Sequence, residues 1–426
     1  MRFASGDYLS VYYLICEGEN LISIPALILA PQVKTALDAG FAAAFEGSPA
    51  RYFSAPGRTE IGGNHTDHQR GRVLAAAVNL DTVAAVRVNG TNIIRIQSKG
   101  YPMSVVNLDN LTPVESEINS TPALIQGVAA RFVQLGCKVE GFDAYCESTV
   151  LPGSGLSSSA AYEVLIGTIL NCLFFDQKLT AIEIALVGQY AENVFFGKPC
   201  GLMDQMASSV GGMIFIDFED PKAPVVEKID FEFAAANHAL CIIDTGADHA
   251  DLTDEYAAVP GELKALCAVL GEGQLRSVSK MDFYTNIQKL REEVGDRAVL
   301  RAIHIYDENQ RVALQKEALE AGDFASFLSY VTESGLSSWR YLQNVIPAGR
   351  KEKQEVAFAL TIAEKLLNGR GACRVHGGGF AGTIQAFVPN DLLEDFKNGI
   401  ESVLGEGSCY VLSIRPQGDV EMEVEG

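Results

Sequence analysis

The sequence predicts a protein of two domains in which helices and strands are mixed. Its 426 residues exceed what one hydrophobic core usually organises, so two domains, or one large domain with insertions, are expected. Short segments rich in β-branched residues lie between residues 51 and 98 and predict a mixed sheet, and longer segments with helical spacing follow. The strand pattern restarts at His238, so we place a domain boundary near residue 236, without a clear linker.

The expected elements of the first half follow from apolar periodicity. Leu37 and Phe41 lie at helical spacing, and Pro122 falls in the first turn of a later helix, where its missing N–H costs little. Pro56 and Gly57 are expected to break the first strand, and a polar loop follows through residue 71. The expected helices cover residues 34–45, 121–135, 158–174 and 180–195. The expected strands cover residues 51–55, 73–78, 82–88, 93–98, 142–148, 212–218 and 225–231.

The second half alternates strands with long helical patterns. A strand, a turn of three glycines and a second strand are expected within residues 373–388. Further strands are expected at residues 238–244 and 409–414. The expected helices cover residues 255–270, 297–320, 324–334, 351–368 and 392–403.

Charge and composition exclude several classes of partner. The formal net charge is −21 and no basic stripe is evident, which argues against nucleic acid and against an anionic membrane surface. The apolar runs near the start of the chain are too short to span a bilayer, so neither a membrane helix nor a signal peptide is expected. The nine cysteines contain no Cys-x-x-Cys pair, which suits free thiols in a reducing cytoplasm. Residues 1–30 form an N-terminal extension of unclear role.

A loop rich in glycine and serine precedes one of the apolar helices. Residues 151–162 read Leu-Pro-Gly-Ser-Gly-Leu-Ser-Ser-Ser-Ala-Ala-Tyr. Glycines allow turns that a Cβ forbids, and the first N–H groups of the helix lack partners at the positive end of its dipole. Both features are typical of a loop that binds phosphate. The alternative is a loop of small residues that only caps a buried helix, since serine caps helices well.

An earlier loop, the first of the three in chain order, is unusually dense in hydrogen-bonding side chains. Six such residues lie within eleven positions: Arg58, Glu60, Asn64, His65, Asp67 and His68. A polyhydroxylated ligand needs this mixture, because each sugar hydroxyl both donates and accepts. One alternative is a solvated surface loop with an Arg–Asp pair. Another is a metal site formed by His65, Asp67 and His68, which no other His or Cys at suitable spacing supports.

A third loop contains Gly377, Gly378 and Gly379 between two expected strands. Successive glycines are costly in chain entropy, so they usually mark a close approach of the backbone to a ligand or to another segment. The alternative is a hairpin with a β-bulge. Taken alone, this loop favours the hairpin.

The order and spacing of the three loops resemble those of one enzyme family. The loops read Pro-Gly-Arg with His-Thr-Asp, then Pro-x-x-x-Gly-Leu-Ser-Ser-Ser-Ala, then Gly-Gly-Gly-Phe-x-Gly. This arrangement resembles the small-molecule kinases named for galactokinase, homoserine kinase, mevalonate kinase and phosphomevalonate kinase. The first loop and the segment Pro199 to Gln205 are similar to galactokinase motifs in particular. The resemblance covers roughly residues 32–415.

The resemblance implies an α+β fold of two lobes with the active site between them. The N-terminal lobe, residues 31–236, is expected to be ribosomal-protein-S5-like, and the C-terminal lobe, residues 237–426, ferredoxin-like. The implied reaction transfers the γ-phosphate of ATP to the C1 hydroxyl of D-galactose, with Mg²⁺ as the metal ion. The implied protein is a cytoplasmic monomer.

The resemblance also implies roles for single residues. Asp204 would act at the anomeric hydroxyl as general base or orienting acceptor, with Arg58 holding its carboxylate ionised. Ser159 and Glu192 would ligate Mg²⁺. The sugar would contact Asn64, His65, Asp67, Gly201 and Tyr256. The ATP phosphates would lie against Gly153, Ser154, Gly155, Leu156, Ser157, Ser158 and Ser159, and Gly377, Gly378 and Gly379 would complete the site.

Structural alternatives stand beside three of these roles. Asp204 could be a helix N-cap after the turn at Gly201, Glu192 an exposed helix carboxylate and Tyr256 a half-buried core aromatic.

The sequence departs from the galactokinase pattern in the first loop. Galactokinases usually read Gly-Arg-x-Asn-Leu-Ile-Gly-Glu-His-Thr-Asp-Tyr, whereas this chain has Glu60 for that Asn, Asn64 for that Glu and His68 for that Tyr. The exchange of acid and amide leaves N-acetylgalactosamine, galacturonic acid and arabinose as alternative substrates. A non-catalytic sensor of galactose and ATP is a second alternative, less supported because the implied catalytic and metal-binding residues are all present.

Overall fold

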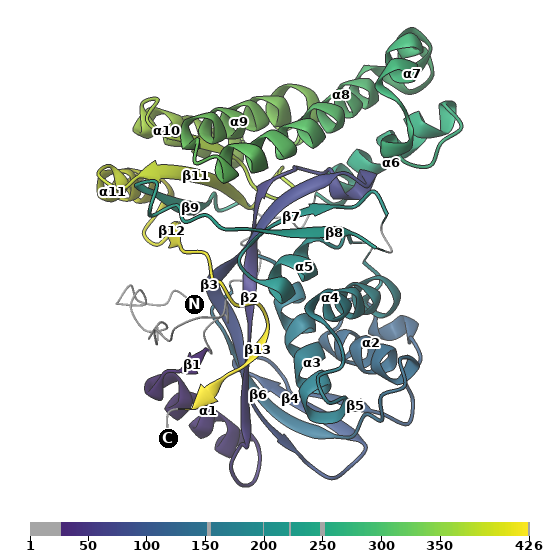
Figure 1. The fold of residues 1–426 in the computed structure, drawn as a ribbon, viewed down its shortest axis with the longest axis vertical. Helices are drawn as coiled ribbons and strands as arrows, with labels where there is room; N and C mark the ends of the chain where they lie inside the picture. Colours follow the sequence, from purple (N-terminus) through teal and green to yellow (C-terminus); the bar gives the residue numbers. More distant parts are fainter. Residues whose placement is uncertain (1–26, 151–154, 199, 221–222, 248–251, 425–426) are drawn as a thin grey trace.

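Two long antiparallel strands, β2 (Arg51–Gly62) and β3 (Arg72–Val88), form the spine of the protein (Figure 1). The computed structural model describes residues 27–150, 155–198, 200–220, 223–247 and 252–424. The helices are α1 (Pro31–Ala44), α2 (Thr121–Gln134), α3 (Ser158–Phe174), α4 (Ala181–Tyr190), α5 (Met203–Val210), α6 (Thr253–Val269), α7 (Lys280–Thr285), α8 (Ile287–Glu320), α9 (Phe324–Ser337), α10 (Glu355–Leu367) and α11 (Leu393–Leu404). The other strands are β1 (Ile28–Leu29), β4 (Ile93–Ser98), β5 (Ser104–Asn107), β6 (Phe142–Ser148), β7 (Met213–Asp217), β8 (Val225–Ile229), β9 (His238–Asp244), β10 (Ala372–Val375), β11 (Thr383–Pro389), β12 (Cys409–Leu412), β13 (Val420–Glu421) and β14 (Glu423–Val424).

The N-terminal lobe is built on the larger sheet of the described chain. Its strand order is β13-β2-β3-β6-β4-β5, with β7 also paired to β3 and β8 to β7. Helices α2 and α3 bury their apolar residues against one face of this sheet, and α1 packs Leu37 and Phe41 onto the other face (Figure 1). Because α3 lies between the sheet and neighbouring helices, it is apolar on nearly all sides.

The C-terminal lobe contains an antiparallel sheet in the order β10-β11-β9-β12. Helices α10 and α11 bury residues such as Leu360 and Phe396 against it. A separate core joins α6 to α8, which is interrupted at Gly295, where φ is +86°. These observations confirm the predicted α+β class. None of the described helices is long and apolar enough to cross a membrane.

The last two strands of the described chain pack with the N-terminal lobe. Strand β13 pairs with β2, and β14 pairs with β1. The buried Arg415 also donates hydrogen bonds to Ser54 (2.6 Å) and Asp81 (3.0 Å) of the N-terminal lobe. The division of the chain near residue 236 stays a prediction, and residues 420–424 pack with the lobe that comes first in the sequence.

The predicted break at Pro56 and Gly57 is wrong. Strand β2 continues through both residues to Gly62, because register shifts between Pro56 and Arg58 and between Glu60 and Gly62 absorb the irregularity. Proline fits at such a bulge, where its missing N–H removes no ladder hydrogen bond. The continued strand places Arg58 and Glu60 on a rigid, buried element instead of a solvated loop.

Candidate active site

The three loops singled out in the sequence meet where the two lobes join. Arg58, on β2, donates from its backbone N–H to the carbonyl of Leu156 at 3.0 Å. At Gly155 an added Cβ would lie 2.8 Å from Thr383 Oγ1 and 3.1 Å from His376 Nδ1. The Gly/Ser loop therefore lies between β2 and the C-terminal sheet, and Gly155 (φ +72°) leaves no room for a side chain there.

Arg58 and Asp204 form an ion pair at the centre of this junction. Arg58 Nε lies 2.7 Å from Asp204 Oδ1, and Arg58 Nη2 lies 2.8 Å from Oδ2. Ser157 Oγ donates to Oδ2 at 2.8 Å. The side chain of Arg58 is 8% exposed and that of Asp204 is 31% exposed, so the carboxylate is the part of the pair that faces open space.

The surroundings keep Asp204 ionised. Burial alone would raise its pKa, but the charge and hydrogen bonds of Arg58 outweigh burial and lower the pKa to about 2. The N-cap alternative is wrong in this structure, because Leu202 is the N-cap of α5 and Asp204 lies within the first turn. A carboxylate in a first turn is also stabilised by the helix dipole.

The Gly/Ser loop ends in a helix start that no side chain caps. Helix α3 begins at Ser158, and its N-cap residue Ser157 adopts a left-handed conformation (φ +57°) without a side-chain cap. The Ser157 hydroxyl binds Asp204 instead. The side chain of the N-cap residue therefore does not cap α3, and the first-turn amides of α3 stay available to an anion. Gly153 and Ser154 lie outside the described residues.

The two predicted metal ligands are neighbours. Ser159 Oγ lies 3.4 Å from Glu192 Oε1. Glu192 is 2% exposed and also accepts a hydrogen bond from Lys198 Nζ at 3.1 Å, so the exposed-carboxylate alternative is wrong. It lies where α4 passes into a π-helical segment (Ala191–Phe196), a distortion often found at functional sites.

A second buried carboxyl, which the sequence did not predict as part of the site, lies near Glu192. Glu163 follows Ser159 by four positions, so both lie on one face of α3. Gln205 Nε2 donates to Glu163 Oε2 at 3.0 Å and to Glu192 Oε2 at 2.9 Å. Burial and the charge of Glu192 raise the pKa of Glu163 well above its ordinary value. One acidic residue within an otherwise apolar helical run was the signal that could have identified it.

This cluster fits a magnesium ion. The Oε1 atoms of Glu163 and Gln205 are buried and accept no hydrogen bond within the described chain. Hydroxyl and carboxylate oxygens are the ligands that Mg²⁺ prefers, and it keeps few protein ligands when phosphates supply others. No three His, Cys, Asp or Glu side chains of the described residues are grouped so as to hold a metal ion, so the structure gives no support to the alternative site of His65, Asp67 and His68.

His65, Asp67 and Gly201 lie together. A Cβ on Gly201 would lie 1.9 Å from Asp67 Oδ2, so Gly201 lets the loop before α5 approach Asp67. His65 Nε2 lies 3.0 Å from the carbonyl oxygen of Gly378 and therefore donates to it. Burial lowers the pKa of His65 to about 4, which leaves its ring neutral near pH 7.

The glycine triplet binds other protein segments closely. Tyr256 OH donates to the carbonyl of Gly379 at 2.6 Å, and a Cβ on Gly378 would lie 2.7 Å from the Tyr256 ring. The carbonyl of Gly377 accepts from Asn64 Nδ2 at 2.5 Å. The close approach that the glycines predicted is thus an approach to Tyr256 and Asn64, and Tyr256 is half-buried against this loop.

Asn64 differs from the other expected sugar ligands. It is fully buried, and besides Gly377 its Nδ2 donates to Glu60 at 3.2 Å. Its Oδ1 accepts from Asn344 Nδ2 at 2.8 Å and from Ser338 Oγ at 3.2 Å. Protein groups take up the hydrogen bonds of this amide. The arrangement therefore supports a role for Asn64 in connecting segments of the protein, and gives no support to a sugar contact.

The exchanged acid, Glu60, has a charged partner. Arg374 Nη2 lies 2.7 Å from Glu60 Oε1, and both side chains are almost completely buried. The pair joins β2 of the first lobe to β10 of the second. Glu60 therefore faces the lobe interface, and its charge is balanced within the protein.

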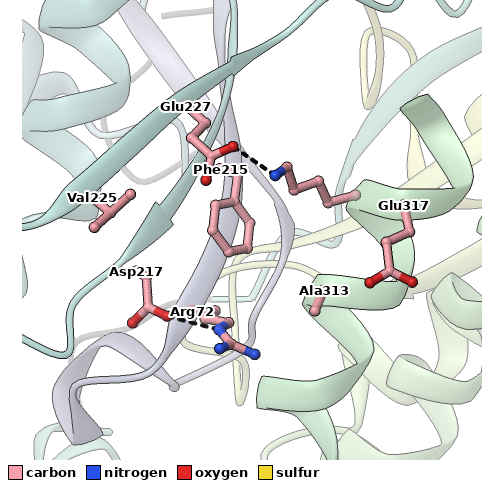
Figure 2. Close-up of a pocket in the computed structure, with 8 residues that line it drawn as sticks. Arg72, Phe215, Asp217, Val225, Glu227, Ala313 and Glu317 are labelled. Carbon is pink, nitrogen blue, oxygen red and sulfur yellow. Dashed lines mark hydrogen bonds and ion pairs between the residues drawn. The ribbon is translucent and has the colours of Figure 1, made fainter.

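A separate pocket lies between β7, β8 and α8 (Figure 2). Phe215 forms part of its wall. The ion pair of Lys316 with Glu227 (2.6 Å) joins α8 to β8 across it, and Arg72 pairs with Asp217 (2.8 Å) on the neighbouring strands β3 and β7. None of the predicted site residues lines it. Because these charges are paired with each other, the pocket adds nothing to the candidate active site.

Comparison with known families agrees with the geometry. The galactokinase galactose-binding signature matches residues 39–88, which contain Arg58, His65 and Asp67. The GHMP kinases N terminal domain matches residues 123–212, which contain Ser159, Glu192 and Asp204.

Similar proteins cover most of the chain. A galactokinase of Actinobacillus pleuropneumoniae serotype 3 (strain JL03) is 31% identical over 361 residues, which are 82% of this chain and 88% of that protein. A galactokinase of Streptomyces coelicolor is 30% identical over 343 residues, covering 80% and 85%. The crystal structure of Lactococcus lactis galactokinase complexed with galactose superposes with a TM-score of 0.78 at 24% identity, covering 91% and 99%. A mevalonate kinase structure superposes with a TM-score of 0.60 at 14% identity, covering 86% and 100%. The chain belongs to the galactokinases, within the GHMP kinase family.

Proposed function

We propose that this galactokinase transfers the γ-phosphate of ATP to the C1 hydroxyl of D-galactose, giving galactose 1-phosphate and ADP. The observation that carries the proposal is the Arg58–Asp204 ion pair, whose carboxylate faces open space beside the uncapped start of α3. A carboxylate that can accept a hydrogen bond from a sugar hydroxyl thus lies beside a site for an anion, as phosphoryl transfer between a sugar and ATP requires.

Asp204 is the group that interacts with the proton of the C1 hydroxyl. Its carboxylate receives the hydrogen bond of the attacking C1 hydroxyl and aligns that oxygen with the γ-phosphate. A pKa of about 2 makes it a weak base, which favours orientation of the hydroxyl over complete removal of its proton before transfer. The proton passes to the Asp204 carboxylate as the bond between the C1 oxygen and the γ-phosphorus forms and the bond between that phosphorus and the β,γ-bridging oxygen breaks, with ADP as the leaving group.

Arg58 and the start of α3 stabilise negative charge. The guanidinium is fixed by Asp204 and by the carbonyl of Gly155, so it is already oriented when the phosphates bind. The first amides of α3 add N–H donors and the positive end of the helix dipole. Charge stabilisation by preorganised groups is usually the largest contribution to this kind of catalysis.

Ser159 and Glu192 are the residues that would hold Mg²⁺, with Glu163 and Gln205 behind them. When bound there, the ion would offset charge on the ATP phosphates. The sugar would lie against His65, Asp67 and Tyr256, near Gly201.

The protein would act as a monomer in a reducing compartment such as the cytoplasm. The cysteines of the described residues are all free thiols, which supports a reducing environment. Light scattering coupled to size-exclusion chromatography tests the oligomeric state, and a stable dimer would contradict the monomer.

The proposal is tested by the product. Purified protein is incubated with galactose, ATP and Mg²⁺, ADP release is followed with coupling enzymes, and phosphorus NMR identifies the phosphorylated hydroxyl. Release of ADP with galactose 1-phosphate as the product is expected. Binding of galactose and ATP without ADP release would favour the sensor instead.

A further inference from the structure

The segment that carries His65 and Asp67 has an unusual backbone. It leaves β2 at Gly62 and turns through Gly63, where φ is +99°. His65 itself is left-handed, with φ of +63°. A residue with a Cβ adopts this conformation at a cost, so other contacts must hold it.

Glu308 of α8 binds two consecutive amides of this segment. Its Oε1 atom accepts from Gly63 N at 3.1 Å and from Asn64 N at 3.4 Å, and also from Ser334 Oγ at 2.7 Å. Its other oxygen pairs with Arg311. Burial alone would raise its pKa, but the neighbouring positive charge of Arg311 prevails and lowers the pKa to about 2. An ionised acceptor binds N–H groups roughly twice as strongly as a neutral one.

His304 binds the next carbonyl of the same segment. Its Nε2 atom lies 3.0 Å from the carbonyl oxygen of Asn64. Because a carbonyl only accepts, Nε2 carries the hydrogen, and Nδ1 accepts from Ser337 Oγ at 2.8 Å. Burial lowers the pKa of His304, which agrees with a neutral ring.

We infer that His304 and Glu308, one helical turn apart on α8, are positioning residues for galactose binding. They bind three main-chain groups in a row, Gly63 N, Asn64 N and Asn64 O. This fixes the left-handed turn at His65 and directs its ring towards Gly378. Neither side chain is accessible, so both act through the backbone and do not touch the sugar. The inference rests on the proposed function in one respect, that His65 and Asp67 contact the sugar.

The alternative is that the two residues only stabilise the packing of α8, and an ion pair that joins α8 to α6 provides the control. Arg301 lies on α8 and is fully buried, and its Nη1 lies 2.8 Å from Glu262 Oε2. Within the described part of the chain, neither residue of this pair forms a hydrogen bond or ion pair with residues 62–66. The variant Glu262→Gln therefore weakens the support of α8 without touching the loop.

The test compares His304→Phe, His304→Gln, Glu308→Gln, Ser337→Ala and Glu262→Gln with the wild type. For each protein the KM for galactose, the KM for ATP, kcat, the calorimetric Kd for galactose and the urea midpoint are measured. Loss of a buried hydrogen-bond partner costs a factor of roughly ten, so His304→Phe and Glu308→Gln should raise the galactose KM and Kd about tenfold or more. The KM for ATP should not change.

Two comparisons separate positioning from stability. His304→Gln keeps an amide donor and should recover most of the galactose affinity that His304→Phe loses. Glu262→Gln should lower the urea midpoint and leave the galactose KM as in the wild type. If His304→Phe or Glu308→Gln does not fold, Ser337→Ala, which removes only the partner of Nδ1, should still raise the galactose KM selectively.

Two results would overturn the inference. One is a rise in both KM values that follows the loss of stability in every variant, Glu262→Gln included. The other is an unchanged galactose KM in all folded variants of His304, Ser337 and Glu308. Wild-type protein that phosphorylates a different sugar would instead contradict the proposed function, and the same comparisons made with that sugar would still decide the role of α8.

Discussion

Asp204 accepts two hydrogen bonds from the guanidinium of Arg58, at 2.7 and 2.8 Å, although the residues are 146 positions apart in the sequence. Arg58 lies on β2 and Asp204 in the first turn of α5. The pair therefore joins a strand to a helix start, and the Gly/Ser loop contacts it through the Gly155 carbonyl and the Ser157 hydroxyl.

Asp204→Asn should nearly abolish turnover and leave galactose binding largely intact. The amide keeps the shape of the carboxylate but cannot accept the hydroxyl proton, a contribution typically worth about 10²- to 10⁴-fold in rate. The measurements are kcat from ADP release and the calorimetric Kd for galactose. Asp217→Asn is a matched control, since Asp217 also pairs with an arginine, Arg72, at 2.8 Å. A kcat that falls equally in both variants would contradict a specific role for Asp204.

The stability difference between wild type and Asp204→Asn should depend on pH only in strongly acidic solution. The folded-state pKa of Asp204, about 2, is below its value in the unfolded chain of about 3.9. The stabilisation from the ionised group is therefore complete above about pH 5, and it is lost as the pH falls from about 4 towards 2. Urea unfolding of both proteins across this range measures it. A difference that disappears between about pH 7 and pH 5 would mean that the pKa is raised.

Glu192→Gln should weaken the binding of Mg²⁺. Removing the charged ligand should raise the Mg²⁺ concentration for half-maximal activity at least tenfold, the scale on which changes around metal sites act. Calorimetric titration of Mg²⁺ in the presence of a non-hydrolysable ATP analogue gives a second readout. Glu147→Gln is the control, because Glu147 also pairs with a lysine, Lys99, at 2.9 Å. An unchanged Mg²⁺ titration in Glu192→Gln would exclude it as a ligand.

Arg374→Met should destabilise the protein by about 3–5 kcal/mol, because it leaves the buried charge of Glu60 without its partner. Arg370→Met, a few positions earlier, removes an exposed pair with Asp391 and should cost about 0–1 kcal/mol. Urea unfolding of the two variants measures the difference. Equal losses would mean that the pair at the lobe interface contributes no more than a surface ion pair.

Local patterns in the sequence predicted many elements well. The apolar run after the Gly/Ser loop gave helix α3 at its observed bounds, and the expected strand at residues 238–244 is β9. Both elements are buried on more than one side, so their hydrophobicity determines them. The family motifs placed Arg58, Ser159, Glu192 and Asp204 in one site, and the structure brings them together.

Long-range pairing could not be predicted in the same way. Pro56 and Gly57 break most strands, but pairing with β3 carries β2 through them by means of a bulge. The polar residues of the first loop look alike in composition, but the structure places them in two different environments. Asp67 lies against Gly201 and His65 binds Gly378, whereas Glu60 and Asn64 face the lobe interface, where residues about 280 to 314 positions away bind them. No local pattern records those partners.

A side-by-side sugar panel tests directly whether D-galactose is the substrate. ADP release is measured with galactose, N-acetylgalactosamine, galacturonic acid and arabinose, with Asp204→Asn as the blank. Wild-type protein should turn over galactose robustly, and the variant should lose that turnover. Turnover of another sugar with none of galactose would contradict it.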